Sequence, residues 1–302
     1  MPAATTGADH DVTKFVQLLI IGIATGSIYG LIALGFTLVY KATKVFNFAQ
    51  GDLMMLGAYF AVLFTVTLTW NPWIAIPAVV LCAVPVGWVF QFVFVRPLIG
   101  QPFLPVTMAT IGGSLVLVSI IPYFWGVIER SYPTQFPQEV YDIAGVKVSS
   151  IDLITIAVAA VCVLAFAVFF KLTTIGLQMR AAATHNEAAI LTGVNVHRVS
   201  LLAWGIGTIL AFVGGIVLAN QQGNVTLAFG ALGLLAFPAV VIGGLESIPG
   251  AVVGGIIVGV LEAMISGYYD PLAATSLVYA VLLLILLVRP TGLFGQREIQ
   301  RV

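Results

Sequence analysis

Nine long apolar runs divide this 302-residue chain and leave nearly all of its charges in the segments between them. An α-helix rises about 1.5 Å per residue and the hydrocarbon core of a bilayer is about 30 Å thick, so about 20 apolar residues span it. Of the 24 charged residues (12 Lys and Arg, 12 Asp and Glu), only Glu262 falls inside a run. The pattern predicts an all-α membrane protein with many crossings, through the runs 15–40, 53–70, 73–95, 103–128, 153–170, 199–219, 227–245, 251–267 and 272–288.

Composition excludes several classes of soluble protein. Hydrophobic residues make up 60% of the chain and charged residues only 8%, whereas a soluble domain carries roughly 25% charged residues. The net charge is zero, which argues against a nucleic-acid binder that depends on a basic surface. Cys82 and Cys162 lie inside apolar runs without the spacing of metal ligands, so we interpret them as small apolar side chains.

The sequence also lacks the short motifs of common enzymes. It contains no G-x-x-x-x-G-K-[ST] loop for ATP, no H-E-x-x-H zinc site and no G-x-S-x-G nucleophile turn. The three histidines lie in the N-terminal tail (His10) and in one polar loop (His185 and His197). We therefore expect a transport subunit without a cofactor or metal of its own, not an enzyme.

The number of crossings depends on the segment 227–245. It contains Gly230, Gly233 and Pro238 and follows a polar stretch. Proline interrupts helical hydrogen bonding, so this segment forms either a full span or a short broken helix that enters from one side. We expect eight or nine transmembrane helices, and nine if the segment crosses.

Positive charges in the loops predict the orientation, because Lys and Arg accumulate on the cytoplasmic side. We expect the N-terminus outside and the C-terminus inside, with the first span retained as a signal anchor. Residues 1–302 would form a single transmembrane permease domain. With nine spans, the cytoplasmic segments hold nine of the twelve positive charges, namely Lys41, Lys44, Arg96, Lys171, Arg180, Arg198, Arg289, Arg297 and Arg301.

Two polar loops are longer than the others, an outer loop at 129–150 and an inner loop at 171–198. In the inner loop, Thr184-x-x-Glu187 has the spacing of a capping box, and Gly193 is a typical residue just after a helix. These residues predict a short helix parallel to the membrane. It is either a simple interfacial connection or a docking surface for a cytoplasmic partner.

Polar residues interrupt the apolar pattern at 44–53 and again at 220–224. Transporters often bind substrate where helices are broken at corresponding places in two halves of the chain. Alternatively, both stretches are interfacial loops, with the Asp52 carboxylate at the positive end of a helix dipole. On the first hypothesis, the residues along the substrate path are Asn47, Gln50, Gly51, Asn220 and Gln222.

Small residues four apart mark closely packed helix faces, since they allow helix backbones to approach within a membrane. Such spacing occurs at Gly22, Gly26 and Gly30 and again at Gly250 and Gly254, so we expect these to pack against other helices. Glu262, the lone acid inside a run, is either a proton-relay group or a structurally paired side chain, and we favour pairing.

Four segments carry recognisable motifs. They are K-V-F-N-F-A-Q-G-D-L-M-M-L-G-A-Y from residue 44, G-L-Q-M-R-A from residue 176 with A-A-I-L-T-G-V-N-V-H-R up to residue 198, V-I-G-G-L-E-S-I-P-G-A-V-V-G-G from residue 241, and R-P-T-G-L-F-G from residue 289. In this order they resemble the branched-chain amino acid ABC transporter permeases of LivH type. Where that family has His or Gln, Gly, and Glu or Asp, this chain has Gln50, Gly51 and Asp52.

The resemblance implies a bacterial plasma (inner) membrane location and a set of partners. These are a second permease of LivM type, two cytoplasmic ATPase subunits that bind the ATP, and an extracytoplasmic substrate-binding protein. The fold would be similar to that of the ribose and cobalamin importer permeases without their first helix. The inner loop would contain the coupling helix that contacts an ATPase subunit, with candidate residues Arg180, Thr184, Glu187, Leu191, Gly193 and Arg198.

The resemblance leaves the substrate open. An uncharged polar path suits a branched-chain or related hydrophobic amino acid delivered by a binding protein, and it would equally pass urea, which similar permeases move along with short amides and other amino acids. Two alternatives come from other classes. One is a secondary carrier driven by protons or Na⁺ with Glu262 as its coupling acid, and the other is a passive pore.

Overall fold

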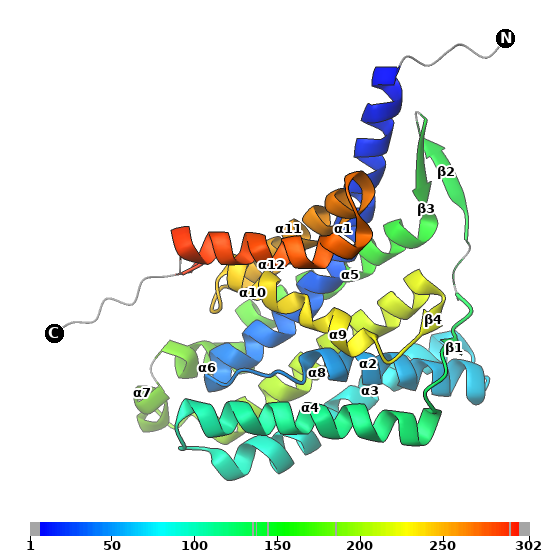
Figure 1. The fold of residues 1–302 in the computed structure, drawn as a ribbon. Coiled ribbons are helices and arrows are strands. Elements are labelled where there is room, and N and C mark those ends of the chain that lie inside the picture. Colours follow the sequence, from blue (N-terminus) through cyan, green and yellow to red (C-terminus); the bar gives the residue numbers. More distant parts are fainter. Residues whose placement is uncertain are drawn as a thin grey trace.

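The computed structural model describes residues 7–134, 136, 138–143, 145–184, 186–289 and 291–295. Within them, eight helical segments are long and apolar enough to cross a membrane. They are α1 (Gly7–Thr43), α2 (Gln50–Val62, continued by a π-helical turn at Leu63–Thr67), α3 (Pro72–Phe90, continued by Gln91–Val95 and Arg96–Leu98), α4 (Phe103–Trp125), α5 (Ser150–Leu172), α8 (Val196–Gln222), α11 (Ile248–Tyr268) and α12 (Pro271–Val288). Figure 1 shows their arrangement.

The shorter elements lie between these spans. The helices are α6 (Thr174–Thr184), α7 (Asn186–Leu191), α9 (Phe229–Leu234) and α10 (Ala236–Gly243), and the strands are β1 (Arg130–Ser131), β2 (Val140–Ile143), β3 (Val146–Ser149) and β4 (Asn224–Val225). The outer loop is therefore not irregular throughout. Its strands β2 and β3 form an antiparallel hairpin, and β1 pairs with β4 at the end of α8.

Polar side chains at five helix starts bind the free N–H groups of the first turn. The side chains of Asn71, Ser149, Asn195, Ser247 and Asp270 accept hydrogen bonds from backbone N–H groups at the starts of α3, α5, α8, α11 and α12. Such caps satisfy donors that lack a helical partner. Three of these helices also carry proline in the first turn, where its missing N–H has no cost. Local sequence therefore fixes where these spans begin.

The ambiguous segment 227–245 crosses the molecule as two short helices. Pro238 has no N–H to donate to the carbonyl of Leu234, and the helix breaks at Leu235 between α9 and α10. The preceding Gly223 accepts a hydrogen bond from the backbone of Tyr132 in the outer loop, whereas Glu246 forms an ion pair with Lys44 at the end of α1. The described chain thus crosses nine times, eight times as long helices and once as this broken pair.

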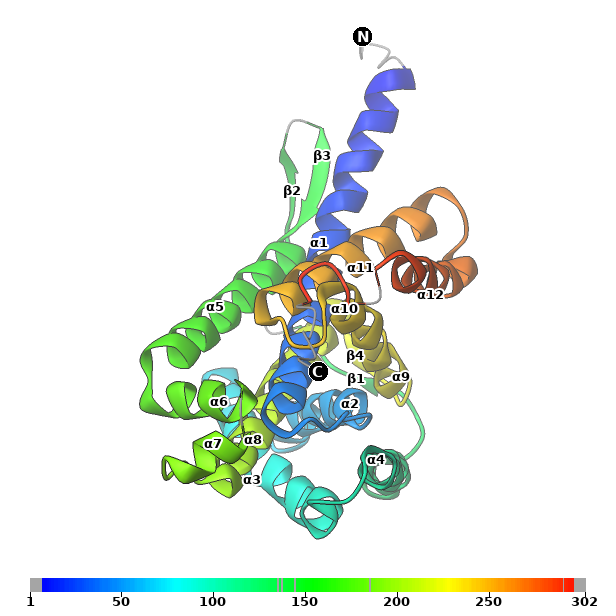
Figure 2. The same ribbon diagram turned by 90° about the vertical axis from the view of Figure 1, so that its left-hand side faces the viewer.

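Glycines hold α1 at the centre of the bundle, where it packs against α11, α8, α5 and α10. A Cβ atom at Gly22 or Gly26 would lie 2.7 Å from backbone atoms of α11. Gly30 also faces α11, while Gly250 and Gly254 face α10. All five of the expected packing glycines therefore make contacts inside this chain. Figure 2 shows α5, α6 and α7 on one side of α1, with α4, α9 and α12 on the other.

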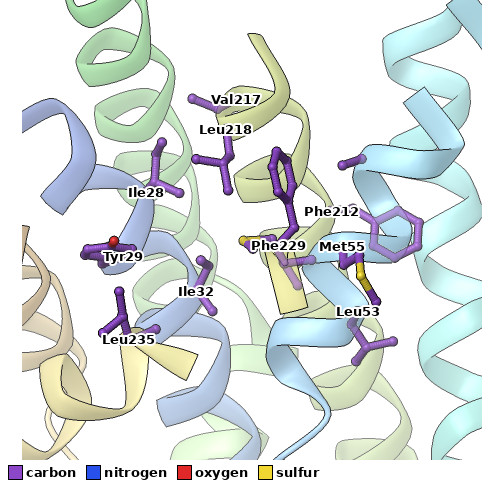
Figure 3. Close-up of a cluster of buried hydrophobic side chains, with 14 of the residues drawn as sticks. Ile28, Tyr29, Ile32, Leu53, Met55, Phe212, Val217, Leu218, Phe229 and Leu235 are labelled. Carbon is purple, nitrogen blue, oxygen red and sulfur yellow. The ribbon is translucent and has the colours of Figure 1, made fainter. Parts of the chain in front are cut away.

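The main apolar cluster joins α1, α2, α8 and the α9–α10 segment (Figure 3). It contains Ile28 and Ile32 from α1, Leu53 from α2, Phe212 from α8 and Phe229 from α9, and each of these is 1% exposed or less. Burial of large side chains on all four elements fixes the depth of α2 relative to α8. This depth positions the polar residues described next.

Candidate functional site

The first polar stretch lies deep in the bundle, because α2 begins part-way across the molecule. Gln50, the first residue of α2, contacts Gly207, which lies near the middle of the 27-residue helix α8. Gly207 in turn lies against Gly35 of α1. The segment between α1 and α2 therefore returns from the end of α1 to near the middle of the membrane before helical structure resumes.

Asn47 and Gln50 form a buried amide network at this point. They are 1% and 3% exposed. The Asn47 Nδ2 donates to Gln50 Oε1 at 2.8 Å, and Gln50 Nε2 donates to the Gly207 carbonyl at 3.0 Å. The backbone N–H of Ala49 donates to Asn47 Oδ1 at 3.2 Å. The network joins the α1–α2 linker to the middle of α8, so the described geometry gives both side chains partners within the protein.

Gly51 allows the first turn of α2 to lie directly on the backbone of α9. A Cβ atom at Gly51 would lie 2.3 Å from the Gly230 carbonyl oxygen, and one at Gly233 would lie 2.4 Å from the Gly51 Cα. Neither position has room for a side chain. The first polar stretch therefore faces the α9–α10 segment, which is the helix break in the second half of the chain.

The second polar stretch lies at the other end of α8, away from Asn47 and Gln50. Helix α8 continues unbroken to Gln222 and ends at Gly223, whose φ is +70°. Asn220 is 4% exposed and donates from Nδ2 to the Ile216 carbonyl at 3.1 Å, while Gln222 is exposed. The structure thus does not bring the five candidate path residues together, because α8 ends at Gln222 and is not interrupted within the membrane.

Asp52 is the polar residue at this junction that the sequence pattern did not single out for the substrate path. The apolar run begins at Leu53, which suggested an interfacial carboxylate. In the structure Asp52 is 7% exposed, the Ser114 hydroxyl of α4 donates to its Oδ2, and its Oδ1 faces Gly230 of α9. The sequence does place an acid one residue before a long apolar run. That position alone does not tell how deep the Asp52 carboxylate lies in the bundle.

The inner loop contains two helices where the sequence predicted one. Thr184 ends α6, and its hydroxyl donates to the Arg180 carbonyl at 2.9 Å. The predicted start of the short helix at Thr184 was therefore wrong, because α6 extends the helical backbone through Thr184 and α7 begins only at Asn186, whereas the capping contact with Glu187 stays a prediction. The side chain of Glu187 lies outside the described residues.

The end of α7 agrees with the prediction. Gly193 has a φ of +85°, and its N–H donates to the Ile190 carbonyl at 3.0 Å. This left-handed position favours glycine. Leu191 is 88% exposed, although it is apolar. The Arg180 guanidinium donates back to the Phe170 carbonyl, and Arg198 is exposed at the start of α8.

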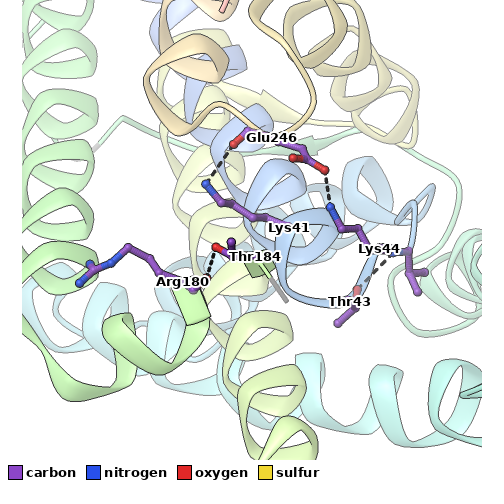
Figure 4. A network of polar contacts seen from close by, with 7 residues as sticks. Lys41, Thr43, Lys44, Arg180, Thr184 and Glu246 are labelled. Carbon is purple, nitrogen blue, oxygen red and sulfur yellow. Dashed lines mark hydrogen bonds and ion pairs between the residues drawn. The ribbon is translucent and has the colours of Figure 1, made fainter. Parts of the chain in front are cut away.

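A cavity of about 710 Å³ connects the inner loop to the end of α1. Its lining comes from the end of α1 and its linker, from the α3–α4 connection, from α6 and α7, and from the start of α8. Lys41 donates to the Glu246 carbonyl at 3.2 Å and Lys44 pairs with the Glu246 carboxylate beside it (Figure 4). Of the candidate coupling residues, Thr184 thus shares a cavity with the segment that leads to Asn47.

Glu262 is paired within the bundle. It lies on α11, where its carboxylate accepts a hydrogen bond from the Tyr29 hydroxyl of α1. Among the described residues no cluster of three or more His, Cys, Asp or Glu side chains could hold a metal ion. The structural-pairing interpretation of Glu262 therefore has a partner on the adjacent helix.

The sequence matches a family model described as "Branched-chain amino acid transport system / permease component" over residues 18–287. The chain belongs to this family. It is therefore a multi-pass membrane permease subunit and not an enzyme, and as a component of a transport system it works with partner subunits. The eight long apolar helices among the described residues agree with membership of a membrane permease family.

Curated relatives cover nearly the whole chain. The high-affinity branched-chain amino acid transport system permease protein LivH of Salmonella typhimurium strain LT2 is 31% identical over 301 residues, which cover 95% of this chain and 98% of that protein. LivH of Escherichia coli K12 has the same identity and coverage. BraD of Pseudomonas aeruginosa, with the same description, is 30% identical over 305 residues, covering 97% and 99%.

Proposed function

We propose that this chain forms part of the membrane pathway through which an ATP-driven importer moves branched-chain amino acids. The observation that carries the substrate class is the 31% identity to LivH over nearly the full length of both chains. A uniformly uncharged amide network at Asn47 and Gln50 is compatible with a small solute that has an apolar side chain. Urea and short amides are the alternative substrates of the same importer class.

The proposed complex contains a second permease of LivM type, two cytoplasmic ATPase subunits and an extracytoplasmic binding protein. The ATPase subunits bind and hydrolyse the ATP, and this chain needs no cofactor of its own. The docking surface on this chain is the inner loop, where α7 presents the exposed Leu191 as its last residue and Gly193 follows in a left-handed turn. An exposed apolar side chain on a short helix in a polar loop is suited to insertion into a groove on a partner.

Movement of the docking helices would reach the buried polar junction through a short path. Helix α6 and the end of α1 line the same cavity, and the linker after α1 leads directly to Asn47 and Gln50. Displacement of α6 and α7 by an ATPase subunit would therefore act on the linker. Because that linker is hydrogen-bonded to the middle of α8, it would shift α2 relative to α8.

The importer is tested by reconstituting this chain into proteoliposomes with its candidate partners and measuring uptake of radiolabelled leucine. Uptake that requires ATP, both types of partner subunit and the binding protein supports the proposal. Uptake that persists without nucleotide and disappears when the proton gradient is dissipated would instead identify a secondary carrier. Uptake of urea in place of leucine would keep the importer class and change the substrate.

A further inference from the structure

We propose that the cavity between the inner loop and the end of α1 binds an anionic phospholipid of the cytoplasmic leaflet. The lipid phosphate would lie against Lys41 and Lys44, and an acyl chain against the apolar residues at the end of α3 and the start of α4. Such a lipid site goes beyond the proposed function and does not depend on the transported substrate. Three features of the cavity carry the proposal: its place at the membrane surface, its unbalanced positive charge and its apolar wall.

The cavity lies at the level where lipid headgroups meet the hydrocarbon core. It has a volume of about 710 Å³, and the end of α1, the end of α3 and the starts of α4 and α8 contribute to its lining. These are the cytoplasmic ends of four spanning helices. Ile99, Phe103 and Ile190 also line it, and each of them is more than half exposed. Large apolar side chains exposed at this level contact the membrane, so the membrane can supply the occupant.

The lining carries positive charge without an acid to balance it. Lys41, Lys44 and His197 belong to the described lining, whereas no Asp or Glu does. Outside this lining, Glu246 pairs with Lys44 through its carboxylate and accepts from Lys41 through its backbone carbonyl (Figure 4). One carboxylate therefore faces two ammonium groups, which leaves one positive charge in excess. Each ammonium group has three N–H donors, so both lysines can hold Glu246 and a phosphate oxygen together.

The start of α4 adds free backbone donors to the same cavity. Phe103 and Val106, in the first turn of this 23-residue helix, both line the cavity. Pro102 precedes the helix, and no side chain caps its first N–H groups. Uncapped N–H groups and the positive end of the helix dipole favour an anionic phosphate. The start of α8, by contrast, is capped by Asn195, so α4 is the helix that can supply donors.

The apolar part of the lining distinguishes a lipid from a small anion. It includes Val45, Val95, Leu98 and Val106, of which Val95 and Val106 are buried. An acyl chain can leave the bilayer for this wall at little cost, because both surroundings are apolar. A free phosphate would leave the wall without a partner. Basic cavities between spanning helices on the cytoplasmic side bind anionic headgroups in membrane proteins, and this lining has the same combination of groups.

The test titrates the full-length chain in mild detergent with dioleoylphosphatidylglycerol and counts the bound lipid by native mass spectrometry. We expect one molecule to bind at saturation, with an affinity about ten-fold or more above that of dioleoylphosphatidylcholine, which has the same chains and no net charge. Glycerol 3-phosphate, which lacks the chains, should not displace the lipid at equal concentration. Equal affinity for the two lipids would overturn the proposed headgroup contact, and displacement by glycerol 3-phosphate would overturn the assignment to a lipid.

Lys41→Gln removes one ammonium group from the cavity, and we expect the affinity for phosphatidylglycerol to fall about five-fold. Lys171→Gln is the matched control, because Lys171 is an exposed lysine at the cytoplasmic end of α5 and does not line the cavity. Its affinity should equal that of the wild type. An equal fall in both variants would overturn the site, since loss of any cytoplasmic charge would then have the same effect.

A second variant covers the case in which Lys41→Gln does not fold. Ala183→Phe keeps both lysines and places a ring in the space, because Ala183 of α6 lines the cavity. We expect this variant to lose the preference for phosphatidylglycerol. Ala181→Phe, at an exposed position of the same helix outside the lining, should bind as the wild type does. Unchanged binding by Ala183→Phe, or an equal loss in both alanine variants, would overturn the proposal.

Discussion

The Lys44 ammonium group forms an ion pair with the carboxylate of Glu246, which lies 202 residues further along the chain. Lys41 donates to the backbone carbonyl of the same residue at 3.2 Å. These contacts join the end of α1 to the turn between α10 and α11, at the edge of the cavity that also reaches the inner loop. Both side chains of the pair are about half exposed, so water weakens their attraction.

Lys44 also has a left-handed backbone, with a φ of +55°. Non-glycine residues adopt this conformation at a cost of about 1 kcal/mol. We expect Lys44→Gly to be close to the wild type in stability, because relief of this cost offsets loss of the exposed ion pair. Lys44→Ala should be less stable than Lys44→Gly by about 1 kcal/mol. Thermal unfolding of the purified variants measures the difference, and equal midpoints would contradict a backbone contribution.

Gly51→Ala should destabilise the protein severely. The new methyl group would lie 2.3 Å from the Gly230 carbonyl, so α2 and α9 would have to separate, at a cost of about 1–3 kcal/mol or more. The control is Gly112→Ala in α4, where a Cβ atom meets no atom within 4 Å. The measurement is size-exclusion chromatography after heating. We expect the monodisperse fraction to fall for Gly51→Ala only. A parallel response in both would show that helix composition, not this contact, is responsible.

Gln50→Leu should destabilise by about 1–3 kcal/mol through its lost hydrogen bonds. Leucine keeps a similar volume but leaves the Gly207 carbonyl and the Asn47 amide without their partner. Both groups are buried, so water cannot replace it readily. The measurement is the thermal midpoint relative to that of Gln222→Leu, which changes an exposed glutamine of α8. Similar midpoints in the two variants would mean that the network contributes little to stability.

Leu191→Asp and Gly193→Pro should abolish association with the ATPase subunits while leaving the protein in the membrane. Leu191 is 88% exposed and would meet the partner directly, and proline cannot adopt the φ of +85° found at Gly193. Glu187→Lys should act in the same direction. Co-purification from membranes measures association, with Lys147→Glu in the outer loop as the control. Normal co-purification of all three variants would remove the docking proposal.

Glu262→Gln tests the carrier alternative. Because the Glu262 side chain is hydrogen-bonded to Tyr29 within the bundle, we expect the neutral variant to retain ATP-dependent uptake with an unchanged dependence on pH. Uptake of leucine across a range of external pH values measures this. Abolished uptake with normal ATP hydrolysis would instead make Glu262 part of the transport path.

The role of Gly193 could be predicted from the sequence, whereas the role of Thr184 could not. Gly193 was predictable because a left-handed residue after a helix favours glycine wherever it occurs. Thr184 was not, since its spacing to Glu187 fits a capping box equally well whether or not the preceding helix continues through it. The structure continues α6 to Thr184 and uses its hydroxyl within that helix. Local spacing alone cannot distinguish these two states.

The sequence by itself determined the membrane class, the eight long spans and the glycine faces of α1 and α11, because hydropathy and residue size act over one or two helical turns. Only the tertiary structure decided that α2 begins near the middle of the membrane, that α9 and α10 together complete the ninth crossing, and that Asp52 lies against Gly230. The depth of a helix in the membrane, and the neighbours that its side chains face, depend on how residues far apart in sequence pack. The same local pattern is compatible with a carboxylate at the interface or in the centre, until the contact between α2 and α9 fixes its position.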